Sequence, residues 1–251
     1  MTVVLDAQGL GKRFGSFHAV DGVDLAVEEG AVHSVIGPNG AGKTTLFRLL
    51  TGVLAPTSGT LAFRGERIEG KRPHAIARRG LVQSFQMTSI FPRLTALESV
   101  EAAIVARERR ALDCLTRFHR STAGEALELL ESVGLGEVGQ LRADTLSHGD
   151  QRALDIALAL ATRPSLLLLD EPTAGMSPTE THRIQALVSE LARGRGLTVL
   201  FSEHDMDVVF GISDRITVLH EGRVIAEGSV ADVQADPQVM AVYLGSAEVA
   251  A

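Results

Sequence analysis

Short, continuously apolar runs recur along the chain, and each leads into glycine or acidic residues. These runs are residues 32–36, 166–169 and 198–201. The first leads into the glycine-rich segment 37–42, after which residues 43–50 have the composition of a helix. Strands that are apolar on both faces belong inside a parallel sheet that helices cover. The pattern therefore predicts an α/β core in which a strand, a glycine-rich loop and a helix follow one another.

Alternating apolar and polar positions predict shorter antiparallel strands outside this core. The N-terminal part contains such segments at residues 3–5, 20–27 and 60–63. Near the C-terminus, residues 216–219 and 223–226 flank Glu221 and Gly222, which is the pattern of a β-hairpin with a tight turn. Two short helices are expected to close the chain.

The middle of the chain lacks strand signals, and helical patterns dominate there. Residues 125–131 place leucines on one helical face, and residues 150–161 are apolar through nearly every helical position. We therefore predict a single domain over residues 1–251. Its expected parts are a core made of residues 1–94 and 164–251 and a helical insertion over residues 95–163.

Composition narrows the class of protein. The chain has 251 residues, 45% of them hydrophobic and 22% charged, with a formal net charge of −7, which is typical of a soluble globular protein. The acidic balance argues against binding along a nucleic-acid backbone, since such proteins concentrate lysine and arginine. Cys114 is the single cysteine, so an intrachain disulfide is excluded and a reducing, cytoplasmic compartment is expected. No uncharged apolar stretch approaches the roughly 18 residues of a membrane-spanning helix.

A phosphate-binding motif lies between the first predicted strand and its helix. Gly37, Gly42, Lys43 and Thr44 fit the pattern G-x-x-x-x-G-K-[ST]. The glycines let consecutive backbone N–H groups turn toward one anion, and the helix N-terminus adds partial positive charge. Lys43 supplies a point charge for the β- and γ-phosphates, and Thr44 can place its hydroxyl on Mg²⁺. A glycine-rich turn without a ligand is the alternative, and the strand–loop–helix context argues against it.

A carboxylate pair, Asp170 and Glu171, follows the second apolar strand at its carboxyl end, where open α/β sheets bind ligands. Asp170 is placed to hold Mg²⁺ directly or through a water, and Glu171 to polarise an attacking water as a general base. Alone, the pair could be a strand end before a turn at Pro172. Together with the phosphate loop it indicates a phosphate-loop NTPase, a class that includes kinases, GTPases and helicases.

A third segment, residues 146–151, opens the apolar helix that ends at Ala161. Ser147 fits the N-cap position and Gly149 leaves the backbone bare, so this helix start is a candidate for a second anion site. A plain capped helix is the simpler interpretation of this segment when it is taken alone.

Taken together, these motifs resemble those of the ATP-binding subunits of ABC transporters, and the resemblance extends over essentially all 251 residues. Residues 37–44 match the Walker A loop, and the carboxylate pair matches the Walker B strand end with its catalytic carboxylate. Residues 146–151 resemble the family signature, with His148 and Gly149 in place of its glycine pair. The other matches are Gln86 for the Q-loop glutamine, His204 for the switch histidine, residues 174–178 for the D-loop and Phe14 for the aromatic ring that stacks on adenine.

The resemblance implies that two such domains face each other head to tail, with each ATP between the Walker A loop of one and the signature of the other. The expected catalytic residues are Glu171, His204 and Gln86. The expected Mg²⁺ ligands are Thr44, Gln86 and Asp170. The residues expected to bind ATP are Phe14, Gly37, Pro38, Asn39, Gly40, Ala41, Gly42, Lys43, Thr44, Thr45, Ser147 and Gly149.

The resemblance also implies partners and a location. Two transmembrane permease subunits would dock near residues 85–91, a second ATP-binding subunit would be the same or a homologous chain, and a periplasmic or extracellular binding protein would act indirectly. No nucleic acid is expected, and the chain would be peripheral at the cytoplasmic face of the plasma (inner) membrane. Residues 203–206, 211–216 and 243–245 resemble ATPases of branched-chain amino acid importers, whereas residues 147–150 also resemble those of importers for urea and other amides.

Two rival functions stay open at this point. One is a soluble ABC ATPase that clamps a nucleic acid or a ribosome, but such proteins carry a long coiled-coil insertion or two cassettes, and this sequence has neither. The other is a phosphate-loop kinase for a small molecule, which would leave residues 146–151 and His204 unexplained. The sequence therefore predicts the ATP-hydrolysing subunit of an ABC importer.

Overall fold

The computed structural model describes residues 2–84, 91–108 and 118–248. Gln86 and Cys114 lie outside the described residues, as does most of the predicted permease-docking segment 85–91. The predictions for these positions therefore stay predictions.

The larger sheet is built around the predicted apolar strands. Its members are β3 (Val32–Ile36), β6 (Leu81–Ser84), β7 (Leu166–Asp170), β8 (Thr198–Glu203), β9 (Arg215–His220) and β10 (Arg223–Gly228). The strand order is β10-β9-β3-β8-β7-β6, and all neighbours are parallel except the β9–β10 hairpin. The three buried strands and the hairpin are confirmed. The pattern does not predict β6, because only Leu81 and Val82 in it are apolar.

The second sheet is antiparallel and lies in the N-terminal part. Its strands are β1 (Val3–Phe14), β2 (Phe17–Glu28), β4 (Ser58–Phe63) and β5 (Glu66–Arg67), in the order β2-β1-β4-β5. The predicted strands are confirmed, but β1 and β2 extend well beyond residues 3–5 and 20–27. The β1–β2 pairing shifts register, for example between Ala7 and Leu10, and each shift interrupts the alternation that marks a strand in sequence.

Helices connect and cover the sheets. They are α1 (Lys43–Leu50), α2 (Pro73–Ala77), α3 (Ala96–Glu108), α4 (Phe118–Ser132), α5 (His148–Leu160), α6 (Pro178–Arg195), α7 (Met206–Ile212), α8 (Val230–Ala235) and α9 (Pro237–Glu248), with 3-10 turns η2 (Gly136–Val138) and η3 (Ala143–Thr145). The two predicted C-terminal helices are confirmed as α8 and α9. Among the described residues, none of these helices is both long and apolar enough to cross a membrane.

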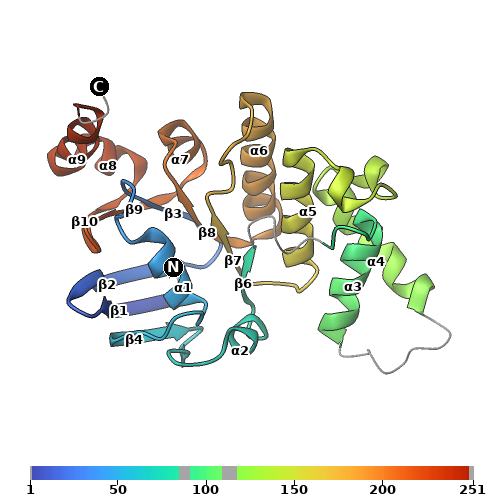
Figure 1. The fold of residues 1–251 in the computed structure, drawn as a ribbon, viewed down its shortest axis with the longest axis horizontal. Coiled ribbons are helices and arrows are strands. Elements are labelled where there is room, and N and C mark those ends of the chain that lie inside the picture. Colours follow the sequence, from blue (N-terminus) through green and yellow to red (C-terminus); the bar gives the residue numbers. More distant parts are fainter. Residues whose placement is uncertain (1, 85–90, 109–117, 249–251) are drawn as a thin grey trace.

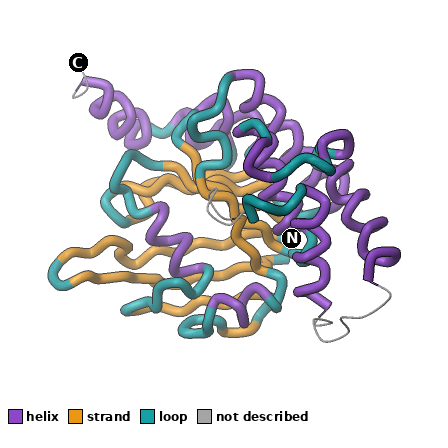
Figure 2. Tube along the Cα trace, turned by 45° about the vertical axis from the view of Figure 1, so that its right-hand side comes forward, coloured by secondary structure: helices purple, strands orange, loops and turns teal. Residues whose placement is uncertain are grey.

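The strands of the larger sheet are apolar on both faces because each face meets its own buried cluster. In β7, Leu166 and Leu168 join a cluster that holds α1 and the antiparallel sheet, whereas Leu167 and Leu169 join one that holds α5, α6 and α7. Burying one leucine fully stabilises a fold by about 1.5–3 kcal/mol. Helix α1 is therefore fixed between the two sheets, which form separate layers in Figure 2.

The predicted helical middle of the chain is confirmed where it is described. Between residues 95 and 163 the described residues form helices, 3-10 turns and loops, with one isolated bridge between Thr95 and Arg142. Helices α3 and α4 stand at the end of the molecule away from α8 and α9 (Figure 1). The predicted boundaries of the helical insertion, at residues 95 and 163, stay a prediction.

Candidate functional site

The carboxyl ends of β3, β7 and β8 bring the two predicted nucleotide motifs together. Ile36, which precedes the glycine-rich loop, pairs with Glu203, and Asp170 pairs with Ser202. Because these strands are parallel neighbours, the loop after β3 and the carboxylates at the carboxyl ends of β7 and β8 share one edge of the sheet. The site therefore has the strand–loop–helix context that the sequence predicts.

Two glycines of the loop cannot be replaced without moving the backbone around them. A Cβ at Gly37 would lie 2.2 Å from the Leu219 carbonyl oxygen, and one at Gly42 would lie 2.5 Å from that of Ala19. Gly42 also has a φ of 105°, which disfavours any side chain. It is the N-cap of α1, and no side chain of the described residues caps this helix. The N-terminal amides of α1 thus keep their capacity for an external anion.

Lys43 is held beneath the same loop. It is only 6% exposed, and its Nζ donates to the carbonyl oxygens of Gly37 at 2.6 Å and Pro38 at 3.3 Å. Burial lowers the pKa of Lys43, and the charges of Glu171, Asp170 and Glu203 act in the opposite direction. The ammonium therefore lies between the loop and the strand-end carboxylates.

The turn of the C-terminal hairpin supports the loop from outside. Gly222 N–H donates to the Ala41 carbonyl at 2.9 Å, and Asp21 N–H donates to the Gly222 carbonyl at 2.8 Å. A tighter turn inside the loop joins Ala41 N–H to the Pro38 carbonyl at 3.1 Å. The predicted loop residues that reach solvent are Asn39, Gly40 and Thr44, whereas Thr45 is half-buried.

Asp170 and Glu171 are positioned by β8. Ser202 Oγ donates to Asp170 Oδ1 at 2.5 Å, and Glu171 N–H donates to the Ser202 carbonyl at 3.1 Å. Glu171 has a φ of 45°, a left-handed conformation that is uncommon for a residue other than glycine and that concentrates at functional sites. The backbone thus leaves the strand direction at the predicted general base.

Glu203 is a buried carboxylate to which the sequence motifs assign no role. One oxygen accepts from Thr173 N–H at 3.1 Å and from Thr173 Oγ1 at 2.5 Å, and the other accepts from His204 N–H at 3.0 Å. It thereby joins the segment after Glu171 to the predicted switch histidine, whose side chain is 60% exposed. The signal was available in the sequence, because Glu203 ends a buried strand as Asp170 does.

A second group of polar side chains that the sequence does not predict lies next to Asp170, at the end of the predicted Walker B strand. Arg152 of α5 donates to the Asp170 carbonyl at 3.1 Å and to Asp155 Oδ2 at 3.1 Å, and Ser84 Oγ donates to the same Asp155 oxygen at 2.5 Å. Burial lowers the pKa of Arg152, against the charges of Asp155, Asp170 and Glu203. Because these side chains lie inside an apolar helical pattern, sequence alone does not single them out.

The signature segment forms the capped start of α5. The Ser147 hydroxyl accepts from Asp150 N–H at 3.1 Å, which confirms Ser147 as the N-cap, and α5 begins at His148, as that cap position predicts. Gly149 N–H donates to Glu180 Oε1 at 3.1 Å. Glu180 belongs to α6, which follows the predicted D-loop. The sequence does not reveal this contact, because it joins residues 31 positions apart.

Phe14 lies at the end of β1, beside the turn of the β1–β2 hairpin. It is 49% exposed, and Lys12 Nζ is 5.3 Å from the centroid of its ring. Ala19 of the same hairpin approaches Gly42 of the phosphate loop. The ring is therefore exposed on the strand pair that borders the loop.

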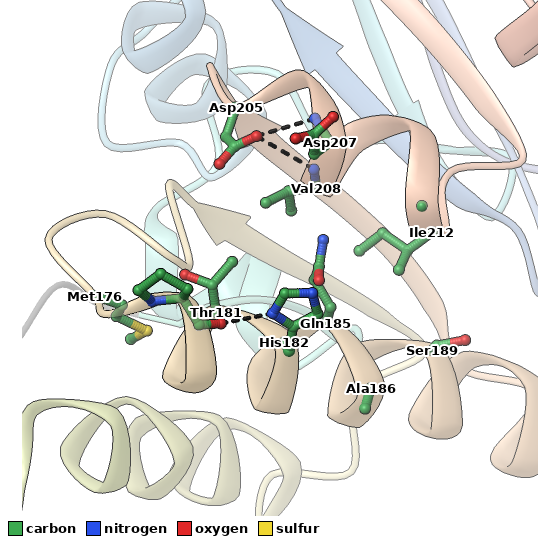
Figure 3. A pocket seen from close by; sticks show the side chains of 12 residues that line it. Met176, Thr181, His182, Gln185, Ala186, Ser189, Asp205, Asp207, Val208 and Ile212 are labelled. Carbon is green, nitrogen blue, oxygen red and sulfur yellow. Dashed lines mark hydrogen bonds between the residues drawn. The ribbon is translucent and has the colours of Figure 1, made fainter.

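A cavity of about 740 Å³ lies between α6 and α7, next to this site (Figure 3). Asp205 caps α7 by accepting from the N–H groups of Asp207 at 2.9 Å and Val208 at 3.4 Å. This cap fixes the chain directly after His204. None of the lining residues belongs to the phosphate loop, so the cavity is separate from the predicted nucleotide site.

The site combines a buried lysine, a helix start that can bind an anion, and carboxylates at the ends of neighbouring strands. Together these features define a phosphate-loop nucleotide-binding protein. Residues 20–174 match the family described as ABC transporter, and residues 223–249 match the branched-chain amino acid ATP-binding cassette transporter family. The chain belongs to the ABC transporter family, in which it is an ATP-binding cassette. The predicted family and fold class are thus confirmed.

Similar proteins cover nearly the whole chain. The high-affinity branched-chain amino acid transport ATP-binding protein BraF of Pseudomonas aeruginosa is 42% identical over 254 residues, which cover 97% of this chain and 98% of BraF. A solved ATP-binding cassette of an ABC transporter in its ADP conformation has a TM-score of 0.87 at 32% identity, over 98% of this chain and 100% of that cassette. A dimeric cassette in a post-hydrolysis state with ADP and Pi has a TM-score of 0.78 at 26% identity. The match covers 90% of this chain and 98% of that cassette.

Proposed function

We propose that this chain binds and hydrolyses ATP to power the import of branched-chain amino acids. The observation that carries the proposal is the meeting of Lys43, Asp170 and Glu171 at one sheet edge, beside a helix start without a side-chain cap among the described residues. BraF, named for branched-chain amino acid transport, supports the cargo. The match of residues 223–249 to the branched-chain family supports it as well.

Each part of the site has a role in this proposal. Lys43 and the loop amides bind the phosphates, and the exposed ring of Phe14 stacks on adenine, for which only a π-face is needed. Glu171 accepts a proton from the attacking water, and His204 donates to the γ-phosphate. Glu203 holds the backbone of His204 in place. The role of Gln86 rests on the family resemblance.

The donor set fits Mg²⁺. Thr44, Gln86 and Asp170 would hold the ion, which when bound neutralises charge on the phosphate oxygens. The described residues contain no group of three or more histidine, cysteine, aspartate or glutamate side chains that could hold a metal ion alone. This agrees with Mg²⁺, which proteins commonly bind through one or two side chains together with substrate phosphates and water.

The nucleotide site is completed by a second subunit in this proposal. ATP on the phosphate loop of one cassette meets Ser147 and Gly149 of the facing cassette, and the dimeric cassette with ADP and Pi supports such a pair. The pair works with two transmembrane permease subunits at the cytoplasmic face of the membrane, supplied by an external binding protein. Nucleic acid has no part in this function.

Replacing Glu171 tests the proposal. Glu171→Gln keeps the shape of the side chain but removes its basicity, so hydrolysis should fall by about 10²–10⁴-fold while ATP binding survives. Because only the closed pair binds ATP at both interfaces, unhydrolysed ATP should accumulate a species of twice the monomer mass in light scattering. Glu190→Gln, at an exposed position of α6, is the matched control and should behave as wild type. Normal hydrolysis in Glu171→Gln would contradict the assigned base.

The cargo needs a separate test. Cells that lack this chain should lose uptake of labelled leucine and regain it when the chain is restored. Uptake of urea should not change. The reverse pattern would contradict the branched-chain assignment and favour an importer for amides.

A further inference from the structure

Glu180 contacts the N-termini of two helices at once. As the third residue of α6 it forms a capping box, in which Oε2 accepts from Ser177 N–H at 3.0 Å and from Ser177 Oγ at 2.6 Å. Its other oxygen, Oε1, accepts from Gly149 N–H of α5 at 3.1 Å. A capping box needs only the contact of Oε2 with Ser177 N–H and the reciprocal one, in which Glu180 N–H donates to Ser177 Oγ at 3.4 Å. The contact with Gly149 therefore calls for a separate explanation.

The glycine at position 149 makes room for this carboxylate. A Cβ at Gly149 would lie 3.0 Å from both Cγ and Oε1 of Glu180. Such a contact is tighter than most side chains tolerate. The Glu180 side chain therefore lies directly against the signature glycine.

The Ser147 hydroxyl, which is the other donor at the start of α5, also bonds to a carboxylate of its own chain. Ser147 Oγ donates to Asp150 Oδ2 at 2.8 Å, and Arg183 of α6 holds the second oxygen of Asp150 at 2.6 Å. The Ser147 hydroxyl and the Gly149 amide are the groups that the proposed function assigns to the γ-phosphate of a facing subunit. In the single chain, both are already bonded to carboxylates.

We propose that Glu180 is a positioning residue that occupies the Gly149 amide in the separate subunit and is exchanged for the γ-phosphate when two subunits pair. This inference rests on the proposed function. One N–H group cannot serve two anions fully, and an ionised carboxylate next to a phosphate repels it. Glu180 thus raises the ATP concentration that pairing requires. It holds the α5 start in order until ATP arrives.

The charge of Glu180 agrees with this exchange. Hydrogen bonds from the Ser177 hydroxyl, the Ser177 amide and the Gly149 amide lower the pKa of Glu180. The group is therefore a carboxylate at neutral pH, when ATP is also anionic. When Glu180 Oε1 releases the Gly149 amide, the capping box of α6 stays intact, because the other oxygen, Oε2, accepts from Ser177 N–H.

Glu180→Asp separates the two contacts. Aspartate at the same position completes a capping box in α8, where Asp232 Oδ2 accepts from Ser229 N–H at 2.9 Å and from Ser229 Oγ at 2.7 Å. The variant keeps the charge and the cap of α6 but is one methylene too short to reach Gly149. Asp232→Asn is the matched control, since it weakens a capping box that has no contact with α5 among the described residues.

The first measurement is amide hydrogen exchange without nucleotide. Gly149 N–H should exchange about tenfold faster in Glu180→Asp than in wild type, as expected when one charge-assisted hydrogen bond is lost. Glu180→Gln, which can still accept from Gly149, should give an intermediate rate. Unchanged exchange in both variants would show that the contact does not hold the amide, and the inference would fail.

The second measurement is an ATP titration of pairing by light scattering in the Glu171→Gln background. Adding Glu180→Asp should lower the ATP concentration for half-maximal pairing by about tenfold, and Asp232→Asn should leave it unchanged. If Glu171→Gln pairs but Glu180→Asp leaves this concentration unchanged or raises it, the role of Glu180 is overturned alone. If Glu171→Gln never pairs, the facing arrangement fails, and this inference fails with it.

Discussion

The groups assigned to phosphate binding lie at the starts of two helices in this cassette. The two starts differ in how many of their N–H and O–H donors already bond to other groups of the same chain. The N-cap of α1 is Gly42, and no described side chain caps the helix. The N-cap of α5 is Ser147, whose hydroxyl caps the helix, and a carboxylate of α6 accepts from the Gly149 amide. The first start is open to an anion, whereas the second is occupied within the chain.

Because of this difference, only one half of the site can act alone. An uncapped helix start with a buried lysine beneath it binds phosphate without help from another subunit. A capped start must exchange an internal partner before it binds anything. Nucleotide should therefore bind to the α1 end of a single chain first, and the α5 end should respond only when a loaded partner approaches.

Removing the buried lysine at the start of α1 should weaken ATP binding most strongly. Lys43→Ala should lower ATP affinity by at least about a hundredfold, because the phosphates lose their nearest point charge. Lys71→Ala, which removes a lysine from the loop after β5, should leave affinity unchanged. A nucleotide-binding titration measures both variants. Wild-type affinity in Lys43→Ala would contradict the phosphate-loop assignment and the proposed contrast between the two helix starts.

A second prediction is that the free energy of unfolding depends on pH through His33, which lies in the strand that leads to α1. His33 of β3, the strand that delivers the loop, is fully buried, and its Nε2 lies 2.8 Å from Thr217 Oγ1. Burial, helped by the charge of Arg215, lowers the pKa of His33 to about 4. Below the unfolded pKa of about 6.5, the unfolded chain binds a proton that the folded chain excludes. The free energy of unfolding should thus fall as pH drops from about 6.5 to 4, by roughly 3 kcal/mol.

Denaturant unfolding of wild type and His33→Gln at pH 7 and pH 4.5 measures this loss. The variant should lose less stability on acidification, by about 2–3 kcal/mol. Glu180 at the start of α5 should not add to this loss between pH 6.5 and about 4.5, since hydrogen bonds from Ser177 and Gly149 lower its pKa below the ordinary value of 4.5. Equal losses in wild type and variant would refute the assignment to His33.

Removing the Ser147 hydroxyl at the start of α5 should have a weaker effect, on hydrolysis alone. Ser147→Ala should leave ATP binding by the single chain intact and reduce hydrolysis by roughly tenfold, because one hydrogen bond to the facing phosphate is lost. Mixing Ser147→Ala with Lys43→Ala leaves one intact composite site in a mixed pair. Hydrolysis by the mixture above that of either variant alone supports the facing arrangement. No recovery would indicate that each site is built within one chain.

The sequence predicts features that local pattern determines, and it does not predict contacts between distant segments. The apolar runs and the glycine-rich loop identify β3, β7, β8 and α1 because each is continuous in the chain. The contact of Glu180 with Gly149 has no sequence signal, because the two residues lie 31 positions apart. Glu203 has a signal as the end of a buried strand, but its contact with Thr173, 30 positions away, has none. The left-handed backbone at Glu171 also has no sequence signal, since glutamate rarely adopts it. The roles of the predicted site residues, Gln86 among them, stay predictions until the variants are measured.

The turn at Gly222 sets a limit on exchanging parts between cassettes of this family. The match to the branched-chain family begins at residue 223, which makes the C-terminal tail look like a removable module. Yet Gly222 bonds to Ala41 of the phosphate loop, and Arg223 pairs with Asp21 of β2 at 2.6 Å. A chimera joined at this boundary would place a foreign turn against the nucleotide loop. A junction after Gly228, at the end of β10, keeps the hairpin native and exchanges only α8 and α9.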